Sequence, residues 1–124
     1  MEISSSLLSW FDLEKRDLPF RKNRNPYRVW VSEIMLQQTK VDTVIPYYNN
    51  WIKNYPNIIS VYESSEPSLL KSWEGLGYYS RCRNFHKAAK IVCEKYNTKI
   101  PGSWDMFRSL PGVGVYTAGA VLSI

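Results

Sequence analysis

Apolar residues recur three and four positions apart along most of the chain, and this spacing is typical of amphipathic helices. Ile3, Leu7, Leu8, Trp10 and Phe11 predict the first of them. Further predicted helices cover residues 27 to about 38, 39 to about 55, 65–75, 81 to about 96, a short stretch from 103, and 115–124. No stretch alternates apolar and polar residues for long enough to predict a strand. We therefore expect an all-α bundle with short connections.

Capping residues and prolines predict where these helices begin. Asn25 followed by Pro26 predicts an N-cap and a first helical turn. Thr39 with Asp42 resembles a capping box, and Pro46 is expected to kink the helix that follows. The other predicted N-caps are Ser65, Ser80 and Ser103.

A glycine hairpin, Leu110–Gly114, precedes the last predicted helix. Pro111 ends any helix before it, and Gly112 and Gly114 permit positive φ and close backbone approach. The helix start leaves N–H groups at the positive end of the helix dipole, which favours an anion such as a nucleic-acid phosphate. An ordinary connection between two helices explains the same residues equally well.

Composition is that of a globular protein, and the charge favours a polyanionic partner. The 124 residues have the length of one domain, with 44% apolar and 15% aromatic residues. Lys and Arg total 16 against 11 acids, a formal net charge of +5. Solvated surface charge is the alternative explanation. No signal peptide or membrane span is predicted, so we expect a cytoplasmic, nucleoid or nuclear protein that is not secreted.

The two cysteines predict neither a disulfide nor a metal site. Cys82 and Cys93 lie 93 − 82 = 11 positions apart in one predicted helix, hence roughly 16 Å along its axis, too far for a bridge. With one histidine and no Cys-x-x-Cys spacing, we expect no metal site in this chain.

Glu33 is the residue whose environment is most unusual. It lies within the nearly continuous apolar run 29–36, which predicts a helix buried on most sides. A buried carboxyl group must be paired or must keep its proton, because desolvation raises its pKa. Glu33 is therefore either the partner of an arginine at the helix edge or a general acid protonated near neutral pH. Gln37, Gln38 and Thr39 follow, and their polar groups serve either to hydrogen-bond base edges or to cap the helix.

Two loops place aromatic rings beside arginines. Tyr78, Tyr79 and Arg81 follow two glycines and predict a wedge or stacking platform for a base step, with core packing as the alternative. Phe20 and Arg21 predict a wall for a flat heterocycle or a simple surface turn.

Taken in order, these segments resemble the MutY-type adenine DNA glycosylases of the helix-hairpin-helix superfamily. The matching stretches are LPFR at 18–21, PYRVWVSEIMLQQTKVDTVIPYY at 26–48, WEGLGYYSRCRNFHKAAK at 73–90 and LPGVGVYTAGAVLSI at 110–124. The resemblance covers nearly the whole chain after Leu18. It implies excision of adenine mispaired with 8-oxoguanine or guanine in double-stranded DNA, after the adenine flips into a pocket. It also implies a monomer when complete.

The resemblance further implies roles for individual residues. Glu33 matches the general acid that protonates the adenine ring, and Gln38 and Tyr78 match residues inserted into the duplex. Tyr116 matches a residue near the reacting sugar. Positions matching the adenine pocket are Arg16, Arg21, Leu36 and Phe20, the last in place of a common tryptophan. Positions matching the phosphate-gripping turn are Leu110, Gly112, Val113 and Gly114.

Within the superfamily, Tyr116 separates two reaction types. Members that also cut the strand, as endonuclease III does, carry a lysine here that forms a Schiff base with the sugar. Tyrosine therefore favours simple hydrolytic base removal over an endonuclease III-like activity.

Part of the family pattern is expected beyond Ile124. The resemblance places there the catalytic aspartate, four cysteines that hold a 4Fe–4S cluster, and a domain that reads 8-oxoguanine. The chain itself has no acidic residue after Asp105 and only two cysteines. We expect either the N-terminal piece of an adenine glycosylase, with its helix-hairpin-helix at about 105–124, or a non-catalytic DNA-binding fragment. A helical protein-interaction module is a third possibility.

Overall fold

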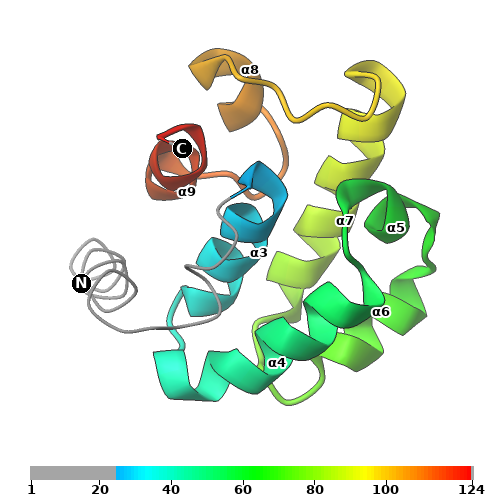
Figure 1. The fold of residues 1–124 in the computed structure, drawn as a ribbon, viewed down its shortest axis with the longest axis vertical. Coiled ribbons are helices and arrows are strands. Elements are labelled where there is room, and N and C mark those ends of the chain that lie inside the picture. The colour runs from blue at the N-terminus through cyan, green and yellow to red at the C-terminus, as the bar shows by residue number, and fades with distance from the viewer. Residues whose placement is uncertain (1–24, 124) are drawn as a thin grey trace.

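A computed structural model describes residues 25–123 of the protein, and this part is built from helices without strands. The helices are α3 (Pro26–Leu36), α4 (Val41–Asn54), α5 (Ile58–Glu63), α6 (Glu66–Trp73), α7 (Tyr79–Lys95), α8 (Trp104–Arg108) and α9 (Val115–Leu122) (Figure 1). The all-α prediction is confirmed for these residues. The predicted first helix and most of the basic loop before Asn25 lie outside them.

Helix α3 runs through the middle of the bundle, with α9 packed on one side and α4 on another (Figure 1). Helices α5 and α6 pack against α7, and the short helix α8 packs against α9. The apolar character of α3 on nearly all sides follows from this position, because neighbouring helices cover most of its surface.

Several predicted helix starts are confirmed. The Asn25 side chain accepts a hydrogen bond of 2.8 Å from the Arg28 amide, and Pro26 occupies the first turn of α3. Ser65 and Ser103 cap α6 and α8 by accepting from amides three residues later. Each cap satisfies an amide that has no partner within the first helical turn.

Two predicted caps are wrong, and one helix was not predicted. Helix α4 begins at Val41 after Lys40, while Thr39 turns back and donates to the Gln37 carbonyl. Ser80 does not cap α7, because that helix already begins at Tyr79. The unpredicted helix α5 is only six residues long, and Asn57 and Ser60 form its capping box.

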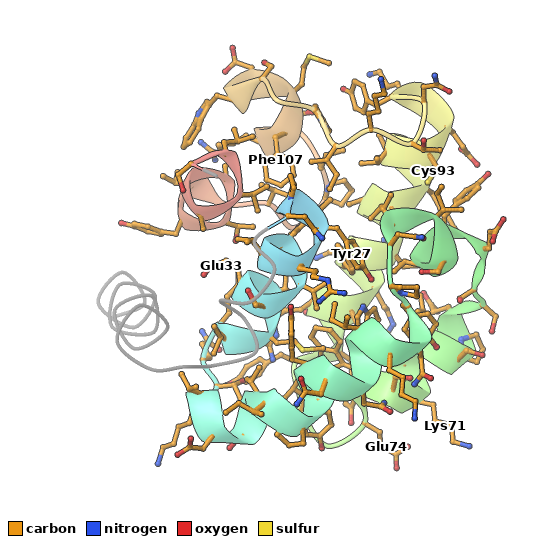
Figure 2. The ribbon with its side chains drawn as sticks, in the orientation of Figure 1. Tyr27, Glu33, Lys71, Glu74, Cys93 and Phe107 are labelled. Carbon is orange, nitrogen blue, oxygen red and sulfur yellow. The ribbon has the colours of Figure 1, made fainter. Side chains whose placement is uncertain are left out.

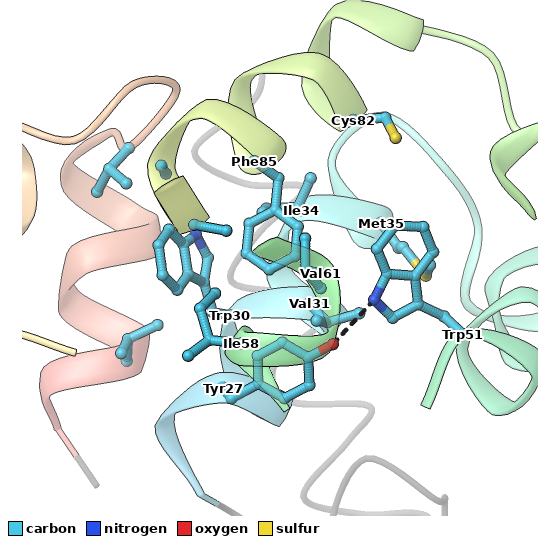
Figure 3. Close-up of a cluster of buried hydrophobic side chains, with 14 of the residues drawn as sticks. Tyr27, Trp30, Val31, Ile34, Met35, Trp51, Ile58, Val61, Cys82 and Phe85 are labelled. Carbon is cyan, nitrogen blue, oxygen red and sulfur yellow. Dashed lines mark hydrogen bonds between the residues drawn. The ribbon is translucent and has the colours of Figure 1, made fainter. Parts of the chain in front are cut away.

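The core is dominated by aromatic rings from different helices (Figure 3). The Trp30 ring of α3 lies edge-on to Phe85 of α7 and to Phe107 of α8, with 4.9 Å between ring centroids in both pairs. Trp51 of α4 donates a hydrogen bond of 3.1 Å to the Tyr27 hydroxyl. The helix that carries Glu33 is therefore fixed by large, well-packed side chains.

Cys82 and Cys93 are both free thiols on α7, as their spacing predicts. Among the helices between Pro26 and Leu122, none has the length and apolar character needed to cross a membrane.

Candidate functional site

Glu33 is buried in α3, as its apolar surroundings predict. Only 7% of its surface is exposed, and burial alone raises the pKa of its carboxyl group to about 7. Within residues 25–123, no arginine forms an ion pair with it. Its side chain lies on the side of α3 away from α7 (Figure 2). A carboxyl group in this state is partly protonated near neutral pH and has a proton to donate.

The raised pKa predicts that the protein loses stability as pH increases. Glu33 is protonated in both folded and unfolded states below about pH 4.5, its ordinary pKa. As pH rises through the folded-state pKa of about 7, the buried group resists ionisation, and folding loses on the order of 3 kcal/mol relative to acid pH. We expect the difference in unfolding free energy between Glu33→Gln and wild type to grow over this window in urea titrations. A difference independent of pH would contradict the raised pKa.

The C-terminal end of α3 is joined to the first turn of α9. The Gln37 side-chain amide donates a hydrogen bond of 3.1 Å to the Thr117 hydroxyl. Gln37 lies four residues, about one helical turn, after Glu33. The two residues are therefore on the same side of α3 and its C-terminal end. Tyr116, next to Thr117, is 42% exposed. The structure thus brings the end of α3 against Thr117, the neighbour of Tyr116, across 80 positions of sequence.

The hairpin prediction is confirmed in its main features. Leu110 and Val113 are buried, and the Val113 amide donates to the Leu110 carbonyl at 3.2 Å. Gly112 has φ +78°, but Gly114 has φ −98°, so the expected freedom of positive φ is used only at Gly112. The first helical hydrogen bond of α9 runs from Ala118 to Gly114, which leaves the amides between them at the helix start.

The Gly112→Ala substitution is expected to destabilise the hairpin. A methyl group there would lie 2.8 Å from Cβ of Asn84, and positive φ adds about 1 kcal/mol or more for a non-glycine residue. Gly114→Ala is the matched control, since nothing lies within 4 Å of its added Cβ. We expect Gly112→Ala alone to lower the urea midpoint clearly. Equal midpoints for the two variants would show that the Asn84 contact does not restrict the turn.

At the start of α7 two tyrosines are exposed, whereas the arginine that follows them is half-buried. Tyr78 is 58% exposed and has a left-handed backbone conformation, with φ 51°. Tyr79 is 38% exposed. Arg81, predicted to contact DNA, is half-buried, and its guanidinium donates to the carbonyls of Ile34, Gln37 and Gly77. Its guanidinium is therefore directed into the protein.

The remaining predicted site residues are divided between surface, core and undescribed segments. Gln38 is exposed with φ 58°, and Thr39 is half-buried. Leu36 is 4% exposed and belongs to the core cluster. Arg16, Phe20 and Arg21 lie outside the described residues.

Sequence reasoning missed two residues at this site. The Thr117 hydroxyl accepts a hydrogen bond from the Gln37 side-chain amide, and Asn84 packs against Gly112. Neither residue carries a local signal, because the partners Gln37 and Gly112 are distant from them in sequence.

The residues of this chain do not fit a 4Fe–4S cluster. Such clusters are held by four thiolates, whereas this chain has two cysteines, both on α7. Burial raises the pKa of the Cys82 thiol to about 12, which keeps it protonated. Residues 25–123 contain no group of three metal-ligating side chains.

The sequence of this chain is similar to those of known adenine DNA glycosylases. The chain is 49% identical to the adenine DNA glycosylase of Buchnera aphidicola subsp. Baizongia pistaciae, covering 95% of this chain and 34% of that protein. It is 46% identical to the adenine DNA glycosylase of Homo sapiens, covering 96% of this chain and 23% of that protein. The chain thus spans about a third or less of these curated relatives.

Solved structures share the fold. A thermostable thymine-DNA glycosylase superposes with a TM-score of 0.80 at 26% identity, covering 97% of this chain and 56% of that one. An endonuclease III–DNA covalent intermediate gives 0.77 at 23% identity, covering 98% and 58%, and this likeness concerns the fold alone. The family model described as HhH-GPD superfamily base excision DNA repair protein matches residues 31–119. The chain belongs to the HhH-GPD superfamily of base excision DNA repair proteins.

Proposed function

We propose that this chain supplies the general acid and much of the DNA-facing surface of an adenine DNA glycosylase. The enzyme removes adenine mispaired with 8-oxoguanine or guanine. The observation that carries the proposal is Glu33, a carboxyl group with a pKa of about 7 that is buried in the central helix. The high identity to proteins named adenine DNA glycosylases supports the choice of base.

In this mechanism Glu33 donates its proton to a ring nitrogen of the flipped adenine. The glycosidic C–N bond then breaks with its electron pair moving to the base, which leaves as a neutral molecule. A water molecule supplies the hydroxyl group that ends on C1′ of the sugar, and its other proton returns to the Glu33 carboxylate. Positive charge on the sugar would be stabilised by the aspartate that the resemblance places beyond Ile124.

Double-stranded DNA is the proposed partner. The hairpin before α9 presents backbone amides at the positive end of the helix dipole, an arrangement that favours an anion, and we propose that a DNA phosphate binds there. Tyr78 and Gln38 are exposed residues with positive φ, and we propose that they enter the duplex beside the flipped base. The net charge of +5 supports binding to a polyanion.

Base removal is expected to occur without strand cleavage, because Tyr116 has no amine to form a Schiff base. Borohydride should therefore trap no covalent complex between the protein and DNA that contains the mispair. A Schiff-base-forming glycosylase run in parallel controls for the chemistry. A trapped adduct would favour the endonuclease III-like alternative.

Adenine release from an A:8-oxoguanine duplex tests the proposed reaction directly. The assay uses the protein that carries this chain, with separate measurement of duplex binding. Binding without release would favour the non-catalytic DNA-binding function. Absence of both would favour a protein-interaction module.

A further inference from the structure

Four non-glycine residues of the described segment have positive φ, and two of them share one partner. The four are Gln38, Tyr78, Asn97 and Thr98. Gln38 has φ 58° and Tyr78 has φ 51°, although they are 40 positions apart and belong to different turns. The carbonyls that precede both residues, those of Gln37 and Gly77, accept hydrogen bonds from Arg81.

This arrangement matters because a peptide group and the next residue's φ are linked. The carbonyl of Gln37 and the amide of Gln38 form one rigid plane, so a bond to that carbonyl helps fix φ at Gln38. The same holds for Gly77 and Tyr78. Left-handed backbone is unfavourable for an L-residue, so surrounding contacts must hold it.

Arg81 is suited to hold both turns at once. One guanidinium nitrogen donates to Ile34 at 2.7 Å and also to Gln37, at the end of α3. The other nitrogen donates to Gly77 at 3.3 Å. A planar guanidinium presents several donors in fixed directions, which a lysine ammonium does not. Its positive charge also suits the C-terminal end of α3.

The Arg81 side chain reaches the exposed aromatic residue as well. Its guanidinium carbon lies 5.1 Å from the centroid of the Tyr78 ring and 5.7 Å from that of Trp73. Trp73 in turn donates a hydrogen bond of 3.0 Å to the Gly77 carbonyl. The Arg81 guanidinium therefore contacts both the backbone of this turn, at Gly77, and the ring of Tyr78.

We propose that Arg81 is a positioning residue that sets the geometry of Gln38 and Tyr78 together, so that the two enter the duplex as one unit. This inference rests on the proposed function, since it assigns both residues to the duplex. It distinguishes Arg81 from an arginine that neutralises a phosphate. The end of the helix that carries Glu33 and the Tyr78 turn then move as one body.

The test compares Arg81→Lys, Arg81→Met and the matched control Arg83→Met, which removes an exposed positive charge from the same helix. Duplexes carry 2-aminopurine beside the mispair, whose fluorescence reports unstacking. We expect both Arg81 variants to bind and unstack the duplex with an affinity about tenfold lower than that of wild type. A loss of this size is typical of a missing charge-assisted hydrogen bond. Thermal melting of each variant checks that the fold is retained.

Two readouts separate positioning from charge or general structure. The slope of log K against log salt should be unchanged in Arg81→Met, which removes the charge, whereas loss of a phosphate contact lowers it by about 0.9. Tyr78→Leu should have a much smaller effect on unstacking in the Arg81→Met background than in wild type. Additive effects, a wild-type-like Arg81→Lys, or a reduced slope would each overturn the proposal.

Failure of the proposed function gives a different result. In that case the wild-type protein itself neither unstacks the duplex nor releases adenine. If wild type does both and the Arg81 variants match the Arg83 control, only the positioning role is excluded.

Discussion

Glu33→Gln is expected to lower the rate of adenine release by about 10²–10⁴-fold, the usual contribution of a general acid. Glutamine keeps the size and the neutral state of the protonated side chain but has no acidic proton. The variant should therefore fold and bind mispaired DNA like wild type. Single-turnover assays with A:8-oxoguanine duplex measure release, and a parallel titration measures binding.

Glu63→Gln is the matched control, because Glu63 is an exposed carboxylate on α5. The pH dependence gives an independent check. Wild-type release should fall as pH rises above about 7, where Glu33 loses its proton. Unchanged release in Glu33→Gln would remove the general-acid assignment, whatever the binding result.

Trp30→Ala is expected to give the largest loss of stability, about 3–5 kcal/mol, as for other buried tryptophans cut back to alanine. The ring is 1% exposed and contacts Phe85 and Phe107, so its removal leaves a cavity where α3, α7 and α8 meet. Because Trp30 lies one turn before Glu33, we expect adenine release to weaken as well. Urea denaturation measures the change in unfolding free energy.

Trp104→Ala is the control for the loss of an indole ring, since Trp104 on α8 is 44% exposed. Its substitution should change stability by less than about 1 kcal/mol. Similar losses for both variants would mean that the ring contacts of Trp30 do not hold the three helices together.

Local features of the chain were sufficient to predict much of the fold. Asn25, Ser65 and Ser103 cap helices where predicted, because a cap depends on groups within three or four residues. The capping box at Thr39 and the cap at Ser80 were wrong because turns competed with them. Thr39 bonds the Gln37 carbonyl, and Tyr78, with a left-handed backbone, is the N-cap of α7.

In the candidate site, too, features that depend on neighbouring residues could be predicted, and features that depend on contacts between helices could not. Its apolar neighbours along the helix were enough to predict that Glu33 is buried, and the spacing of Leu110–Gly114 was enough to predict a hairpin. Arg81 shows the opposite case. An arginine beside two tyrosines indicated a nucleic-acid contact, yet its guanidinium bonds carbonyls of α3 and of the turn before α7.

The order and polarity of residues alone determined that this chain forms helices, where most of them begin, and that a carboxyl group is buried in one of them. These properties arise from contacts within a few positions, which a linear sequence contains. Only the tertiary structure decided that Gln37 bonds Thr117, that Asn84 lies against Gly112, and that one guanidinium bonds carbonyls of two turns. Such contacts depend on how separate helices pack, and packing is a property of the whole folded chain.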